Sequence, residues 1–167
     1  LIRLLKYSTD LSAWVQIWSF PGDVDEEIGY GLDMVNLSPT LNRIAIRRAD
    51  KVIIRDIDSE GNMQILGAEP PAPVGKLVKL NSAGTIMAVA SETLNGQKGR
   101  VEVFHSSDPG GGFLAWTSNV IFDGEVSGDR LGYSLAIDDS GTRVAFGIPY
   151  KNDTGIVQVY DYDGSGW

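Results

Sequence analysis

The decisive stretch of the sequence is Ala136-Ile137-Asp138-Asp139-Ser140-Gly141-Thr142-Arg143-Val144-Ala145-Phe146. It starts with apolar residues, passes through a polar turn and ends in an apolar–Ala–apolar core. The same pattern occurs at 36–46 and 79–89, so it recurs about every fifty residues. Repeats of this length are typical of units that cannot bury their own apolar face and must stack on neighbours. The chain is therefore predicted to be a repeat protein.

The bulk composition favours a globular chain rich in strands and turns. The 167 residues are 43% hydrophobic and 22% charged, and 20 of them are glycine. The net charge of −8 disfavours binding to nucleic acid or to an anionic membrane surface. The absence of cysteine excludes disulfides and thiolate metal sites, although a large β core is compatible with secretion without them. No apolar run is long enough to span a bilayer.

A second block recurs after each core and alternates between apolar and polar residues, which is the pattern of a half-buried strand. Its copies are 2–7, 52–55, 101–104 and 157–162. A turn and a large apolar residue then follow, namely Trp14, Met63, Trp116 or Trp167. We expect these side chains to pack in the core, because indole rings supply large apolar area between layers.

One repeat predicts four strands. The last copy gives strands at 131–137, 143–148 and 155–162, with a fourth strand expected after Trp167. The turn at 138–142 contains Asp, Ser and Gly, which suit a tight hairpin. Ala45, Ala88 and Ala145 occupy the same place in the second strand, where a small residue suits close packing between sheets. Four-stranded antiparallel units of about fifty residues predict an all-β fold, a β-propeller segment.

The segment 129–149 resembles the FG-GAP repeat of integrin-alpha-like β-propellers. That family typically has Phe-Gly-x-Ser in its first strand, a Gly turn, an Ala-Val-Gly-Ala-Pro strand, a Gly-x-Val-x-Val-Tyr strand and a Trp. Gly155–Tyr160 and Trp167 fit this continuation.

The resemblance covers nearly the whole chain as about three and a third blades. It implies the end of a blade at 1–22, blades at 23–68 and 69–123, and an incomplete blade at 124–167. The chain lacks an initiator Met and starts inside a repeat, so we expect it to be a piece of a longer protein. Closure of the propeller would then require the remaining blades or partner copies.

The resemblance also raises calcium, because blades of this family can carry an Asp-x-Asp-x-Asp-Gly loop whose carboxylates converge on one cation. The nearest match places candidate metal ligands at Asp56, Asp58 and Glu60, followed by Gly61. The later carboxylate of the family pattern is missing, so the sequence favours a solvated hairpin turn over a calcium site at these residues. We therefore expect no tight metal site and no cofactor in this segment, with calcium at Asp56, Asp58 and Glu60 kept as the alternative.

A second acidic segment contains Asp23, Asp25, Glu26 and Glu27 and is echoed by Glu125 and Asp129. Such a loop could bind a cation or a basic partner, or could serve as a soluble connection.

His105 is the only histidine of the chain. A single histidine argues against a His-based catalytic triad or a His-rich metal site in this segment, and we expect His105 at an exposed turn. Gly110–Gly112 is predicted to be a hairpin tip, since no helix follows to form a phosphate loop. No catalytic motif is present.

Two glycosylation sequons occur, at Asn36-Leu37-Ser38 and at Asn152-Asp153-Thr154. Asn152 is predicted in an accessible loop, whereas Asn36 is predicted within a strand and is followed closely by Pro39. The sequons matter if the protein enters the secretory route, which the family resemblance implies.

The sequence favours a non-enzymatic scaffold for adhesion or structure, in a protein located outside the cell or at its surface. Its partners would be the remaining blades or other protein subunits, with no nucleic acid and no membrane span in this segment. Two alternatives remain open: a carbohydrate- or ligand-binding propeller, including an enzymatic one, and an intracellular assembly protein.

Overall fold

The structure is a computed structural model that describes residues 2–20, 28–48, 51–65, 76–108 and 114–167. The described chain is all-β, as predicted, with two short helical turns, α1 (Leu94–Gln97) and η1 (Lys151–Asp153). All strands that lie next to each other within a sheet pair in the antiparallel direction. Alternating apolar residues form the strands, and Gly-, Asp- and Ser-rich segments form the connections.

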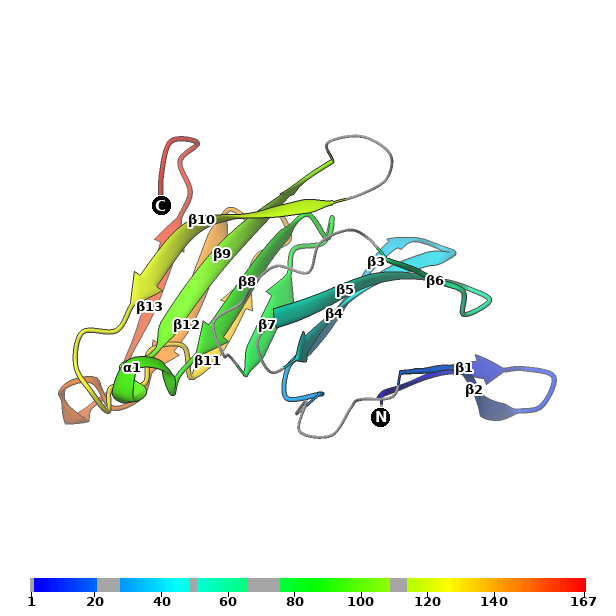
Figure 1. Ribbon diagram of the computed structural model, residues 1–167, viewed down its shortest axis with the longest axis horizontal. Coiled ribbons are helices and arrows are strands. Elements are labelled where there is room, and N and C mark those ends of the chain that lie inside the picture. Colours follow the sequence, from blue (N-terminus) through cyan, green and yellow to red (C-terminus); the bar gives the residue numbers. More distant parts are fainter. Residues whose placement is uncertain (1, 21–27, 49–50, 66–75, 109–113) are drawn as a thin grey trace.

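The strands form four sheets, each built from strands that are consecutive in the sequence (Figure 1). The first sheet contains β1 (Ile2–Ser8) and β2 (Ala13–Phe20). The second contains β3 (Leu32–Ser38), β4 (Leu41–Arg48), β5 (Lys51–Asp58) and β6 (Met63–Ile65). The third contains β7 (Leu77–Leu80), β8 (Ile86–Ser91), β9 (Arg100–Ser107) and β10 (Ala115–Asp123). The fourth contains β11 (Ser134–Ile137), β12 (Arg143–Ile148) and β13 (Ile156–Asp161).

The last three sheets are arranged through their first strands. Strand β7 lies against β3 on one side and against β11 on the other. The first strands of successive sheets are thus neighbours, which is compatible with part of a radial array of blades. The described sheets do not close into a ring.

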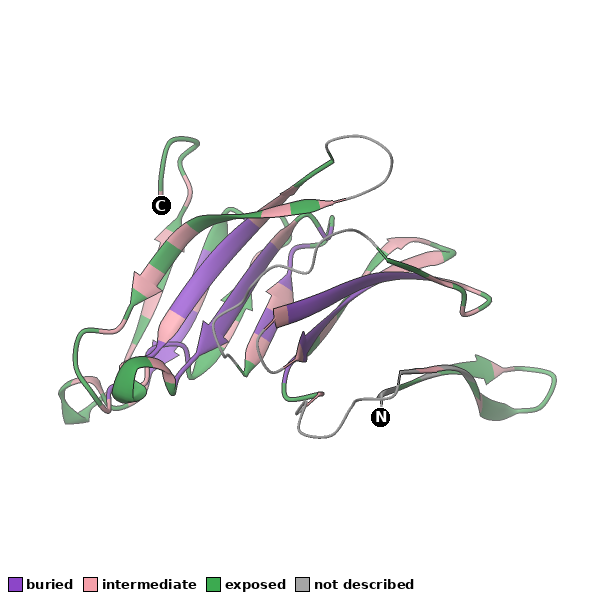
Figure 2. Ribbon diagram, viewed as in Figure 1, coloured by how far each residue is buried: buried purple, intermediate pink, exposed green. Residues whose placement is uncertain are grey.

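Two apolar layers hold these three sheets together (Figure 2). Between the second and third sheets, Ala45 and Ile54 pack on Met87, Val89 and other buried side chains. Between the third and fourth sheets, Ala88, Ala90, Val101 and Val103 pack on Val144, Phe146 and Ile148. Successive side chains of the third sheet therefore pack on opposite neighbours, so both faces of β8 and β9 are buried.

The same contact is repeated at both junctions. In the second sheet, Arg43 lies against Gly84, a residue in the β7–β8 turn of the third sheet. At the equivalent place in the third sheet, Ile86 lies against Gly141 in the β11–β12 turn of the fourth sheet. Both glycines have positive φ, +63° and +77°, and a Cβ atom at either would come within 3 Å of the neighbouring side chain. Glycine is therefore required for both the turn and the close approach.

The turns themselves are also joined. The Ser82 amide donates a hydrogen bond of 3.1 Å to the carbonyl oxygen of Asp139. The Asn81 amide group reaches the Ser140 carbonyl oxygen at 3.4 Å. The predicted hairpin at 138–142 is present, closed by the Gly141 amide on the Asp138 carbonyl at 3.0 Å. The polar turns of the repeat thus fix successive sheets in register as well as reversing the chain.

Two expectations about burial are wrong. Ala45 and Ala88 are fully buried as predicted, but Ala145 is only half-buried, because no described sheet covers its face of the fourth sheet. Trp14 is not in the core: it is 68% exposed and meets only the edge of Tyr7 in an aromatic contact, with ring centroids 5.6 Å apart. Trp116 and Trp167 are half-buried and pack against the two apolar layers.

Candidate functional site

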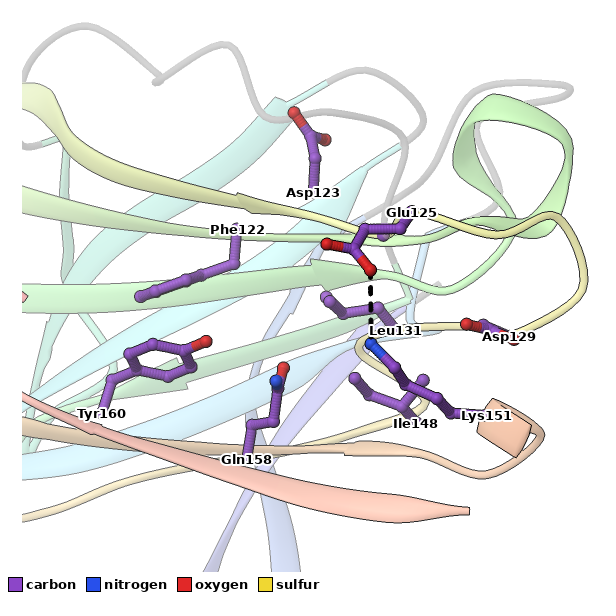
Figure 3. A pocket seen from close by; sticks show the side chains of 10 residues that line it. Phe122, Asp123, Glu125, Asp129, Leu131, Ile148, Lys151, Gln158 and Tyr160 are labelled. Carbon is purple, nitrogen blue, oxygen red and sulfur yellow. Dashed lines mark ion pairs between the residues drawn. The ribbon is translucent and has the colours of Figure 1, made fainter. Parts of the chain in front are cut away.

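A cavity of about 240 Å³ opens between the third and fourth sheets (Figure 3). The end of β10 and the segment that follows it form one wall, and β13 with η1 forms the other. Most of the side chains that point toward it are polar, and its lining residues are Phe122, Asp123, Gly124, Glu125, Asp129, Leu131, Ile148, Lys151, Gln158 and Tyr160. The cavity is the best-formed candidate site in the described part of the chain.

The two walls of the cavity are bridged by an ion pair. Glu125, on the segment after β10, lies with its Oε2 atom 3.6 Å from Nζ of Lys151 in η1. This separation leaves both groups able to bind a further polar partner. Asp123 differs, because Arg100 holds both of its oxygens at 2.6 and 3.0 Å. Glu125 and Lys151 are therefore available to a ligand, whereas the carboxylate of Asp123 is already bound by Arg100.

Asp129 is the unusual group of the cavity. Its residue surface is only 8% exposed, and its side chain lines the cavity. No hydrogen bond or ion pair from any described residue reaches its carboxylate, and its oxygens are not among the described polar atoms that are both fully buried and unpartnered, so they open onto the cavity. A carboxylate in such a largely buried residue needs hydrogen-bond donors, which solvent or a ligand in the cavity can supply.

The inner wall of the cavity is apolar and rigid. Tyr160 packs on Phe122 with ring centroids 4.4 Å apart and on Phe146 at 5.7 Å. Leu131 and Ile148 are buried beside them. Strand alternation explains the mixture: Gln158 and Tyr160 point toward the third sheet, while Val157 and Val159 point to the opposite face. The cavity thus combines apolar walls with several polar groups, of which Glu125 and Lys151 form a loose ion pair, and this mixture is typical of ligand sites.

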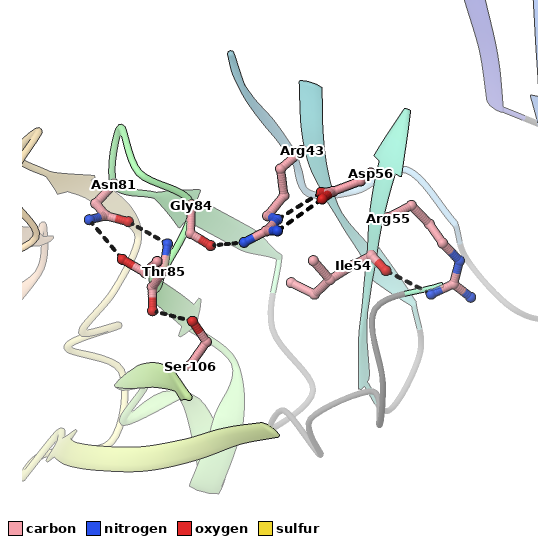
Figure 4. A network of polar contacts seen from close by, with 8 residues as sticks. All are labelled: Arg43, Ile54, Arg55, Asp56, Asn81, Gly84, Thr85 and Ser106. Carbon is pink, nitrogen blue, oxygen red and sulfur yellow. Dashed lines mark hydrogen bonds and ion pairs between the residues drawn. The ribbon is translucent and has the colours of Figure 1, made fainter. Parts of the chain in front are cut away.

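The candidate calcium ligand Asp56 is held by Arg43 (Figure 4). Asp56 is buried, and its two oxygens accept hydrogen bonds of 2.8 and 2.9 Å from the Arg43 guanidinium. The same guanidinium donates from Nη1 to the Gly84 carbonyl oxygen at 2.8 Å and so links the second and third sheets. Asp56 therefore belongs to a junction between sheets and not to a solvated turn.

Asp58 closes the turn that follows. Its carboxylate accepts bonds from the Glu60 amide at 2.9 Å and from the Asn62 amide and side chain at 2.9 and 2.8 Å. The bond from the Asn62 side chain lowers the pKa of Asp58. No group of three acidic, His or Cys side chains in the described ranges is placed to hold a metal ion. Calcium binding at Asp56, Asp58 and Glu60 stays an untested alternative.

His105 is not at an exposed turn, and that expectation is wrong. It lies inside β9, half-buried, opposite Ile86. Its Nε2 atom is buried with no hydrogen-bond partner among the described residues, and its ring meets the edge of Tyr162 at 6.1 Å. Burial lowers the pKa of His105 below its usual value of 6.5.

The sequons lie in different settings. Asn152 is exposed in η1, in the connection between β12 and β13 as predicted. Asn36 is also exposed but lies in β3, where its side-chain amide donates to Asn42 at 3.3 Å. The acidic residues Asp23, Asp25, Glu26 and Glu27, and the glycines 110–112, lie outside the described residues.

Sequence reasoning singled out Glu125 and Asp129 as the echo of an acidic loop, but not the cavity that they line. Lys151, Gln158 and Tyr160 reach it from distant positions in the chain, and only the packing of two sheets brings them there. No described helix has the length and apolar character of a membrane span. No protein-family model matches the chain, and no curated protein matches it either.

Proposed function

We propose that this chain is a segment of a β-propeller that acts as a non-enzymatic scaffold, binding further sheets or protein subunits through its blade faces. The observation that carries the proposal is the junction that occurs twice, Arg43 on Gly84 and Ile86 on Gly141. A junction that repeats with the sequence repeat supports a stack that can continue by the same rule.

The fourth sheet carries residues that correspond to those at the two junctions, but no described sheet packs on them. Ala136, Ala145, Val157 and Val159 form what we call the open face, on the side of the sheet away from the third sheet. Their counterparts in the third sheet, such as Ala88 and Val103, are fully buried. Val159 in β13 is 56% exposed, whereas its counterpart Val103 in the third sheet is fully buried.

The occupant that fits the open face is another antiparallel sheet of the same repeat. The two existing junctions show the complementary surface: large side chains such as Met87 and Val89, or Val144 and Phe146, packed on the small Ala residues. Arg143 and Asp161 flank the face at the place that corresponds to Arg43 and Asp56 in the second sheet, where Arg43 contacts the next turn. Continuity with these interfaces supports a sheet over other kinds of partner.

The scaffold role accords with the absence of a catalytic motif from the sequence. An extracellular or cell-surface location is part of the proposal, supported by the exposed sequon at Asn152 and by the resemblance to FG-GAP repeats. An intracellular assembly protein would use the same faces. The fold does not distinguish the two locations, which expression experiments can test.

Sedimentation equilibrium of the 167-residue chain tests the proposal. In the isolated chain the available sheets belong to other copies, so we expect concentration-dependent self-association through the open face. Val159→Lys places a charge on that face and should leave the chain monomeric, because an unpaired buried charge opposes association.

Val126→Lys is the matched control. Val126 is equally exposed, at 56%, but lies on the segment after β10 and away from the open face. The Val126→Lys variant should associate as the unchanged chain does. The proposal would be contradicted if the unchanged chain stays monomeric at all concentrations, or if both substitutions abolish association equally.

A further inference from the structure

We propose that the cavity between the third and fourth sheets binds a small, neutral, hydroxyl-rich ring, of the chemical class of a monosaccharide. This site is separate from the open face and does not depend on the scaffold role. It rests on the cavity itself, on Asp129, whose residue surface is only 8% exposed and whose carboxylate has no partner among the described residues, and on the polar groups around it.

The balance of donors and acceptors selects the ligand class. Glu125 and Asp129 offer carboxylate oxygens, which can only accept hydrogen bonds when ionised. Lys151 and the Gln158 amide offer donors, and the Tyr160 hydroxyl can do either. A ligand must therefore donate at one end and accept at the other. Hydroxyl groups do both, so a polyhydroxylated ring can satisfy all of these groups together.

Charge and size exclude the main competitors. A phosphate or carboxylate ligand would meet two carboxylates, one of them buried, against a single lysine. A compact cation would be repelled by Lys151, and the described residues contain no group of three acidic, His or Cys side chains placed for a metal ion. The volume of about 240 Å³ is below the roughly 300–1,000 Å³ typical of sites for drug-sized ligands. One ring, not a chain of several, fits.

The apolar wall gives such a ring a second means of attachment. The faces of a sugar ring carry C–H groups, which pack well on aromatic and aliphatic side chains. Leu131 and Ile148 are held in the apolar layer, and Tyr160 is held by its stacking on Phe146. The wall is therefore formed before the ligand arrives, which limits the entropy lost on binding.

Ligand-observed saturation-transfer NMR tests the inference, with D-glucose, D-galactose, D-mannose and myo-inositol added separately to the bacterially produced chain, which carries no glycan at Asn152. At least one should bind in the millimolar range, and a proton–nitrogen correlation spectrum of the labelled chain should show a shift of the Gln158 side-chain amide when that compound is added. Asp129→Asn and Glu125→Gln should each weaken that binding by roughly tenfold or more, because each removes a charged acceptor.

Asp139→Asn is the matched control, since Asp139 is an exposed aspartate in the β11–β12 turn, outside the cavity. It should bind as the unchanged chain does. Glu125 has a side chain that is 80% exposed, so Glu125→Gln keeps the test valid if Asp129→Asn fails to fold. The inference is overturned if none of the four compounds binds, if both variants bind as tightly as the unchanged chain, or if inorganic phosphate binds in their place. None of these results would alter the self-association measured by sedimentation.

Discussion

Ala145 lies directly opposite Val159 across β12 and β13, in the same relationship that Ala88 has to Val103 across β8 and β9. The second pair is fully buried under the fourth sheet, whereas the first pair faces solvent. The two alanines thus have the same neighbours within their sheets and differ in what covers them. This difference separates the effect of the strand from the effect of the sheet-to-sheet contact.

Leucine at the two positions should therefore have different effects. Ala88→Leu inserts three carbon atoms into a filled layer and should lower the free energy of unfolding by about 1–3 kcal/mol. Ala145→Leu should change it little in the monomeric chain, although the sequence alone predicts the same cost for both. Urea denaturation at low protein concentration measures both values. Equal losses would show that the open face is covered in solution.

The ion pairs Arg43–Asp56 and Arg143–Asp161 offer a second comparison, because they occupy equivalent positions in the second and fourth sheets. The side chains of the first pair are 9% and 7% exposed and those of the second 61% and 60%. Asp56→Ala leaves a buried guanidinium without its partner and should cost about 3–5 kcal/mol.

Asp161→Ala removes an exposed pair of similar geometry, so water replaces the lost partner and stability should hardly change. Both variants can be measured in the same denaturation series. A small loss for Asp56→Ala would contradict the assignment of Arg43 to the junction between sheets.

His105 should make stability depend on pH. Burial lowers its pKa in the folded chain, while the unfolded chain takes up the proton near pH 6.5. The associated stability is therefore present above pH 6.5 and is lost as the pH falls through the folded-state pKa. His105→Gln removes this contribution. Subtracting its unfolding free energies from those of the unchanged chain between pH 8 and 5 should give a difference that falls at acid pH, and a constant difference would contradict the burial of the ring.

Glycosylation distinguishes the two sequons. Asn152 is exposed in η1, a short turn, whereas Asn36 lies in a paired strand and binds Asn42. When the chain is secreted from eukaryotic cells behind a signal peptide, we expect a glycan at Asn152 and none at Asn36. The mass should fall to that of the bare chain in Asn152→Gln and stay unchanged in Asn36→Gln. A glycan retained in Asn152→Gln would contradict this expectation.

Strands and hairpins could be predicted from the sequence because they depend on local alternation and turn residues. The Gly141 turn and the alternation of 156–161 are examples. Burial between sheets could not be predicted from the sequence, since Ala88 and Ala145 have the same local pattern but different neighbouring sheets. The position of His105 cannot be predicted for the same reason: its environment comes from Ile86 and Tyr162, which no local sequence signal connects to it.

The cavity could not be predicted from the sequence either. Glu125 and Asp129 were recognisable as an acidic segment, but Lys151 and Gln158 reach them only because β13 lies across from β10. A single sequence carries no signal for such a meeting of distant residues. Predictions about sites that lie between sheets therefore depend on knowing which sheets pack together.

The stacking of the sheets is tested most directly by nuclear Overhauser effects between them. Ile86 lies so close to Gly141 that its Cδ1 atom would be 2.5 Å from a Cβ added there. The chain should therefore show a strong effect between the δ1 methyl protons of Ile86 and the α protons of Gly141. It should also show effects between the methyl protons of Ala88 and the side chain of Phe146, which share one apolar layer. Their absence from a folded sample, with the contacts within each sheet intact, would contradict the repeated junction on which the proposed scaffold rests.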